Sequence, residues 1–182
     1  MFYTYGSRAN TEPLTVDKVK AYLKIEHNED DDLILDLIAI KRAYIEESYN
    51  HNLIGGSIVI NCLYKRVIQL PVMPIADLVS VKLYDSDGVV IPYTVKTSEI
   101  RKGQGVLILD ESQLSDLDSS REIEIVINVG YESIDDIPKP IIHALMLLVG
   151  SAYDCRGDKE TNPRMSTAAR DLLEPYRYRK IY

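Results

Sequence analysis

Apolar side chains recur at helical spacing in the first third of the chain. They begin after Asp30 and continue for about 20 residues, at positions Leu33, Ile34, Leu37, Ile38, Tyr44, Ile45 and Tyr49. This spacing predicts a long amphipathic helix, with Glu46 and Glu47 largely outside its apolar face. A helix of about two turns is predicted before it, because Thr15 is a good N-cap and Asp17 places a negative charge in the first turn.

The most apolar stretch of the chain is residues 137–153, with the sequence IPKPIIHALMLLVGSAY. Pro138 and Pro140 suit the first turn of a helix, where missing amide donors cost little. Only His143 interrupts the apolar run at 141–149, so we expect a helix buried by its own domain or by neighbouring subunits. The run is too short to span a bilayer, which needs about 18 to 20 apolar residues. We expect His143 to be a hydrogen-bonded core or interface residue.

The pattern changes after Gly56, where short runs rich in Ile and Val alternate with turn residues. The predicted strands are residues 57–63, 67–70, 78–84, 89–95, 106–109 and 123–129. Residues 85–88, with the sequence DSDG, are a strong turn signal and predict a β-hairpin. In the last strand apolar residues alternate with Glu122, Glu124 and Asn128, which is typical of a half-buried strand.

The order of these elements predicts an α+β fold class. We expect a helical core of two N-terminal and two C-terminal helices with an inserted antiparallel β-rich segment. The last helix is predicted at 166–174 and ends at Pro175, after a polar loop at 157–163. The expected parts are an N-terminal arm at 1–13, the helical core at 14–54 and 137–175, the β-rich insertion at 55–136 and a C-terminal docking tail at 176–182. The arm has no periodicity, and we expect it to be loose or docked on a partner.

Composition narrows the class of function. The 182 residues allow one domain with a good core, or a core plus an inserted lobe. A formal net charge of −7 argues against a dominant, nonspecific grip on nucleic acid phosphates, which needs excess Lys and Arg. Cys62 and Cys155 are isolated and indicate neither a disulfide framework nor a zinc site, which favours a reducing cytosol. With no signal peptide or transmembrane pattern, we expect an intracellular soluble chain.

No constellation of residues supports catalysis or metal binding. The acidic runs at 29–32 and 85–88 lack the ligand spacing of a calcium loop, and are better explained as a helix first turn and a β-turn. The three histidines show neither HxxxH nor HExxH spacing. The GxSxG elbow and the Walker loop are absent as well. We therefore expect no enzymatic activity, no metal and no cofactor.

The C-terminal tail is the best candidate for a functional site, because aromatic and basic residues alternate in it almost at strand period. The residues expected to bind a partner are Tyr176, Arg177, Tyr178, Arg179, Lys180 and Tyr182. Such a segment could add to the edge of a partner's sheet or press into its groove. Two alternatives stay open: stacking on single-stranded nucleic acid, and a frayed terminus whose positive charge suits a helix end.

Several short motifs follow one another in a characteristic order from Leu14 onward. They are LTVDKVKAYL at 14–23, the acidic start and long helix at 30–49, LPVMPI at 70–75 leading into VSV at 79–81, the turn at 85–88, VGY at 129–131, IPKPI at 137–141, AY at 152–153 and ARDLLEPYR at 169–177. In this order and spacing they resemble the tailed-bacteriophage head–tail connector (adaptor) protein family over nearly the whole chain. Residues 1–13 and 50–66 match the family pattern least.

The resemblance implies a structural virion protein without catalytic activity, located at the head–tail junction and present in the host cytoplasm during assembly. Such a chain, even if monomeric in isolation, would form a homo-oligomeric ring, dodecameric in the virion, beneath the portal protein. The ring would extend a channel through which DNA passes without specific binding, and would bind the neck or tail-completion protein below it. The terminal segments of such adaptors reach onto the portal, which would give residues 176–182 a partner. The alternatives are a neck or tail-completion protein that contacts the tail, and a nucleic-acid-binding regulator that uses the C-terminal Tyr and Arg residues.

Overall fold

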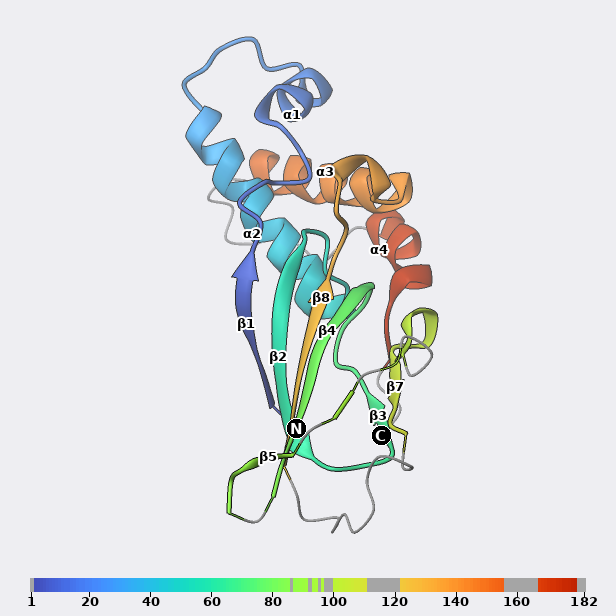
Figure 1. The fold of residues 1–182 in the computed structure, drawn as a ribbon. Coiled ribbons are helices and arrows are strands. Elements are labelled where there is room, and N and C mark those ends of the chain that lie inside the picture. The colour runs from blue at the N-terminus through green and yellow to red at the C-terminus, as the bar shows by residue number, and fades with distance from the viewer. Residues whose placement is uncertain are drawn as a thin grey trace. The chain divides into compact units, whose positions relative to one another are not determined.

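The computed structural model describes residues 2–85, 87–91, 93–94, 96, 100–110, 122–155 and 167–179. These residues form two compact units, each assembled from segments that are distant in the sequence (Figure 1). The β unit comprises residues 2–9 and 54–132, and the helical unit comprises residues 10–53 and 133–179. The loop expected at 157–163 lies outside the described residues.

The described part of the helical unit contains four α-helices. They are α1 (Val16–Leu23), α2 (Asp31–Tyr49), α3 (Lys139–Asp154) and α4 (Thr167–Leu173). The expected N-cap of α1 is confirmed, because the Thr15 hydroxyl accepts a hydrogen bond from the Lys18 N–H at 3.3 Å. The 3₁₀ helix η4 (Ile134–Asp136) precedes α3, and η5 (Glu174–Tyr176) follows α4 directly.

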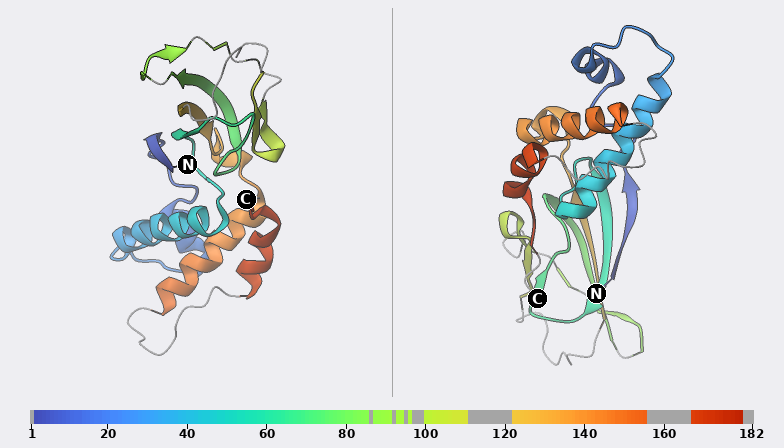
Figure 2. Two further views of the ribbon diagram at one scale, coloured as in Figure 1. Left: turned by 90° about the horizontal axis from the view of Figure 1, so that it is seen from below. Right: turned by 180° about the vertical axis from the view of Figure 1, so that it is seen from behind.

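One face of α2 and one face of α3 form the core of the helical unit, where α3 crosses α2 (Figure 2). The buried residues on these two faces are Ile34, Ile38, Ile45 and Tyr49 of α2 and Ile141, Ala144, Leu145, Leu148 and Val149 of α3. They recur with the period of the helix, which places them on one side of each helix. The α3 helix is not buried all round, since Ile142 and Met146 are half-buried and His143 is exposed. The prediction that His143 is a core residue is therefore wrong, and an interface role stays a prediction.

The β unit contains two antiparallel sheets among its described residues. The five-stranded sheet has the order β1-β2-β8-β4-β5, and the three-stranded sheet has the order β3-β7-β6. The strands are β1 (Phe2–Arg8), β2 (Gly56–Leu63), β3 (Val67–Gln69), β4 (Ile75–Tyr84), β5 (Val90–Ile91), β6 (Ile100–Arg101), β7 (Val106–Ile108) and β8 (Glu122–Val129). The predicted hairpin is present between β4 and β5, but within 89–95 the strand covers only Val90–Ile91 of the described residues. Residue 86 of the turn lies outside them.

Alternation along β2 and β8 buries one face of the larger sheet. Ile58 and Ile60 of β2 lie opposite Ile127 and Ile125 of β8, and all four side chains are fully buried. The predicted half-buried character of β8 is confirmed by this alternation. Strands β3 and β7 contribute further apolar side chains to the same core.

Residues 2–8 form a strand, which differs from the loose or partner-docked arm expected for 1–13. In β1, Tyr3 pairs with Ile60 and Tyr5 pairs with Ile58 of the neighbouring strand β2. Every residue of β1 except Tyr3 is exposed, and Tyr3 packs in part against the core of the β unit. Because β1 is an edge strand that buries little apolar surface, its sequence shows no clear alternation.

Gly130, directly after β8, lies where three segments of the β unit come close together. Its φ of +84° is in the left-handed region, and its N–H donates to the Pro74 carbonyl at 3.0 Å. A Cβ atom at this position would lie 2.1 Å from the carbonyl oxygen of Ile54. Only glycine therefore fits both the backbone conformation and the space.

We expect Gly130→Ala to lower the free energy of unfolding by about 2–4 kcal/mol, because it combines a strained φ with a backbone clash. Gly88→Ala is the matched control, since Gly88 has a φ of +78° but nothing within 4 Å of the added Cβ. It is expected to cost about 1 kcal/mol. Urea unfolding measures both values, and equal losses would contradict the role of the close approach.

Candidate functional site

The described part of the expected docking tail lies against the C-terminal end of α2, within the same unit. The Tyr178 N–H donates to the Tyr49 carbonyl at 2.9 Å. The side-chain amide of Asn50 donates in turn to the Tyr178 carbonyl at 3.2 Å. These two hydrogen bonds fix the backbone of the tail beside the residue at which α2 ends.

Arg177 caps α2. Its Nη1 donates to the Ser48 carbonyl at 2.8 Å, and its guanidinium carbon lies 4.2 Å from the centre of the Tyr49 ring. The last turn of α2 contains no basic residue. The last carbonyls of a helix have no partner within the helix, and they favour a positive charge. Arg177 supplies this charge from a part of the chain far away in the sequence.

Glu174 binds both arginines of the described tail. Its carboxylate lies 2.9 Å from Arg177 Nε and 3.0 Å from Arg179 Nη2. Hydrogen bonds from Arg177 and Arg179 lower the pKa of Glu174. Apart from this ion pair the Arg179 side chain lies largely in solvent, with 78% of it exposed.

The six expected binding residues therefore have different surroundings. The structure brings Tyr176, Arg177 and Tyr178 together on α2, half-buried, and leaves Arg179 at the surface. Lys180 and Tyr182 lie outside the described residues. Partner binding by this segment stays a prediction.

His51 links the end of α2 to η5. Its imidazole is 8% exposed and meets the Tyr176 ring edge to face, with 5.9 Å between the ring centres. Burial lowers the pKa of His51, and this effect outweighs a backbone hydrogen bond with Tyr176 and the negative charge of Glu46. The neutral imidazole is therefore the native form at neutral pH.

A largely buried ionic network lies in the last two turns of α2. Arg42 binds Glu12 and Glu46, with N–O distances of 2.7 Å to each, and the second Glu46 oxygen accepts the Leu53 N–H at 2.9 Å. The two carboxylates raise the pKa of Arg42, although burial acts against them. The sequence pattern placed Glu46 outside the apolar face. The structure buries it to 4% exposure, because it binds both a guanidinium and a backbone amide.

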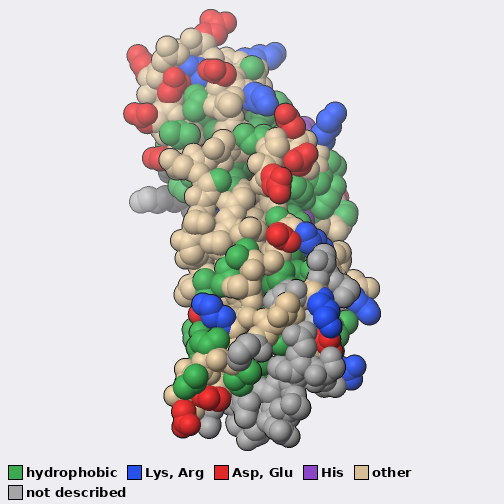
Figure 3. All heavy atoms as spheres, in the orientation of Figure 1, with side chains coloured by type: hydrophobic (Ala, Val, Ile, Leu, Met, Phe, Trp, Pro, Cys, Tyr) green, Lys and Arg blue, Asp and Glu red, His purple; other side chains and the backbone are tan. Residues whose placement is uncertain are grey.

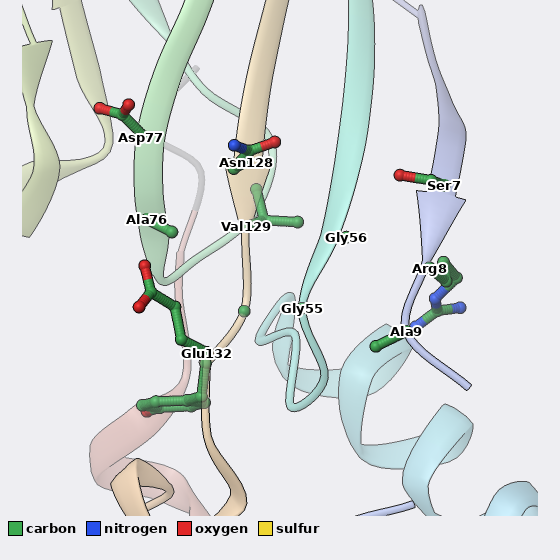
Figure 4. A pocket seen from close by; sticks show the side chains of 12 residues that line it. Ser7, Arg8, Ala9, Gly55, Gly56, Ala76, Asp77, Asn128, Val129 and Glu132 are labelled. Carbon is green, nitrogen blue, oxygen red and sulfur yellow. The ribbon is translucent and has the colours of Figure 1, made fainter. Parts of the chain in front are cut away.

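The β unit holds a pocket of about 460 Å³ lined by β1, β2, β4 and β8. Its charged side chains, Arg8, Asp77 and Glu132, lie on separate segments and do not converge on one point (Figure 4). A Cβ on Gly56 of this pocket would lie 2.6 Å from the Ser7 carbonyl oxygen, so close backbone contact alone explains this glycine. The arrangement offers no acid–base pair or nucleophile for catalysis.

The described part of the chain contains no group of three or more His, Cys, Asp or Glu side chains that could hold a metal ion. None of its helices combines the length and the apolar character needed to cross a membrane. Within the same residues, no buried polar side-chain atom lacks a hydrogen-bond partner.

Comparison with known proteins gives a match in fold without a match in sequence. No protein-family model matches the chain, and no curated protein matches it. Three matching solved structures are the neck of an empty gene transfer agent (GTA) particle computed with C6 symmetry (TM-score 0.78, 19% identity), the virion of the native GTA particle (0.76, 19%) and the neck of the native GTA particle computed with C12 symmetry (0.75, 20%). Each match covers 100% of this chain and 98% of the other. At this identity the likeness shows a shared fold.

We expect Arg177→Ala to lower the free energy of unfolding by about 1–2 kcal/mol, because α2 loses its C-terminal cation and the stacking on Tyr49. Arg177→Lys keeps the charge but not the planar guanidinium, so its free energy of unfolding is expected to lie between those of the wild type and Arg177→Ala. Arg179→Ala is the control and should stay within about 0.5 kcal/mol of the wild type. Chemical denaturation measures all three, and an equal effect of the two alanine variants would contradict the capping role.

We expect the free energy of unfolding to fall as the pH drops below the ordinary His pKa of about 6.5. In this range His51 binds a proton in the unfolded chain but stays neutral in the native protein, because its native pKa is lower. Urea unfolding near pH 7.5 and near pH 5.5 should give a larger loss for the wild type than for His51→Gln, by an amount on the order of 1 kcal/mol. Parallel pH dependence in the two proteins would contradict the buried neutral state.

Proposed function

We propose that the chain is a structural subunit of the head–tail junction of a phage-like particle. One observation carries this proposal: its fold matches chains from the neck and virion of GTA particles over 100% of this chain and 98% of each matched chain. The order of motifs from Leu14 onward supports the same class of protein.

The finer assignment is an adaptor that forms a ring under the portal protein and joins the capsid to the neck or tail. The C6 and C12 symmetry of the matched neck structures supports a ring, with twelve copies as the expected number. A subunit with a formal net charge of −7 suits a DNA channel, because its field repels the phosphates that pass it. DNA would then move through the ring without specific binding.

The tail remains the proposed contact with the portal. Arg177 and Tyr178 fix the start of the tail on α2, so Arg179 leaves a defined point of the helical unit with its side chain exposed. An anchored start reduces the conformational entropy that the following residues lose on binding. We therefore assign the portal contact to Arg179, Lys180 and Tyr182, and a supporting role to the residues before them.

The structure weakens the nucleic-acid alternative. Arg177 already binds Ser48 and Tyr49, so it is not available to stack on a base. On the face drawn in Figure 3, acidic and basic side chains are interspersed, without a large basic patch among the described residues. Binding of single strands needs a continuous positive groove with stacking rings.

Portal binding tests the proposal. Wild-type chain mixed with the portal protein of the same particle should elute as one complex in size-exclusion chromatography. The variant Arg179→Ala/Lys180→Ala/Tyr182→Ala should bind at least about tenfold more weakly, because Arg and Tyr side chains dominate the binding energy of such interfaces. Lys65→Ala/Arg66→Ala removes two positive charges elsewhere and should bind like the wild type.

Full binding by the triple variant would contradict the role of the tail. If the chain binds the tail-completion protein and not the portal, the adaptor assignment is wrong and the chain is a neck or tail-completion protein. A gel shift of DNA or RNA at low salt, without binding to either protein, would favour the nucleic-acid regulator.

A further inference from the structure

The α2 helix carries a second apolar face, separate from the one that forms the core. This face, which we call the α2 stripe, consists of Leu33, Leu37, Ile40 and Tyr44. Its spacing of four, three and four residues keeps all four within about 60° of the helix circumference. Ile40 is 58% exposed and Tyr44 is 44% exposed, while the other two are half-buried.

Single exposed apolar residues are ordinary on protein surfaces. Leu35, on another side of α2 and 47% exposed, is such a case. Four apolar side chains in one line have instead the spacing of a helix–helix contact. The α2 stripe therefore has the form of a surface that packs against another element.

One border of the α2 stripe is acidic. Asp36 and Glu47 are exposed and lie along this border, and neither belongs to an ion pair within the described residues, whereas Lys41 lies along the opposite border. A surface that covers the stripe gains most when it combines apolar area with positive charge. This requirement restricts the chemistry of the partner.

The same chain offers such a surface on α1. Lys18, Ala21 and Tyr22 are exposed and share one side of this helix, and Tyr22 is 46% exposed. Lys24, in the left-handed C-cap position, adds a second exposed lysine at the end of α1. This set, which we call the α1 face, joins an aromatic ring to two positive charges.

We infer that the α2 stripe of one copy binds the α1 face of a second copy, an inference that rests on the proposed function. A closed ring with cyclic symmetry requires two different, complementary surfaces on every subunit. The α2 stripe and the α1 face are two such surfaces, since both carry apolar or aromatic side chains and their charges are opposite. The aromatic ring of Tyr22 packs on the apolar stripe, and the lysines pair with Asp36 and Glu47.

Disulfide trapping between two copies tests the contact. The full chain first receives Cys62→Ala and Cys155→Ser; one preparation then carries Ile40→Cys and the other Tyr22→Cys. The two preparations are mixed at concentrations on the order of 1 mM, where weak contacts are populated. The disulfide between Ile40→Cys and Tyr22→Cys should form at least about tenfold faster than the disulfide between Leu35→Cys and Tyr22→Cys. Leu35 is the matched control, since it is an exposed apolar residue of the same helix.

Each outcome decides one point. Equal rates for the Ile40 and Leu35 pairs would overturn the inference. Ile40→Cys linking to itself as fast as to Tyr22→Cys would also overturn it, because the stripe would then meet a second stripe. If the chain is found in the neck but the two pairs react at equal rates, the inferred contact fails and the proposed function stands. If the Ile40 pair reacts faster but the chain is absent from the neck, the contact stands and the proposed function fails.

Discussion

The C-terminal end of α2 is the point on which the helical unit depends. Buried Glu46 must be satisfied there, and it is satisfied by Arg42 and by the Leu53 N–H. Arg42 binds Glu12 as well, so the segment before α1 is tied to the same place. Arg177 completes the arrangement by capping the helix from the C-terminal segment. Three distant parts of the chain thus meet because one helix end leaves polar groups that need partners.

The periodicity of apolar residues predicted those features of the fold that depend on local spacing along the chain. The four helices and the alternation in β8 follow from positions that repeat every three to four or every two residues. Partners that are distant in the sequence left no such signal. Arg177 and Ser48 are 129 positions apart, and the burial of Glu46 depends on groups that the helical pattern does not contain. Strand β1 was missed because all of its residues except Tyr3 are exposed, so its sequence carries no alternation of apolar and polar positions.

The two apolar faces of α2 explain why its sequence pattern is broad. The positions expected to form one face divide in the structure into a core set, which includes Ile34 and Ile38, and a second set nearer the surface, which includes half-buried Leu37 and exposed Tyr44. Ile40, which the sequence pattern did not assign to the face, belongs to the second set. The core set packs within the helical unit, and the second set forms the surface that we propose for the contact between copies.

The central claim is that this chain forms a ring between the portal and the tail. Cryo-electron microscopy of the neck of particles that carry the chain, reconstructed without imposed symmetry, tests it directly. We predict a closed ring at the portal, with each copy fitting both the helical unit and the β unit, and with twelve copies as expected from the C12 neck match. A neck without density for this fold, or density for it only elsewhere in the particle, would contradict the claim.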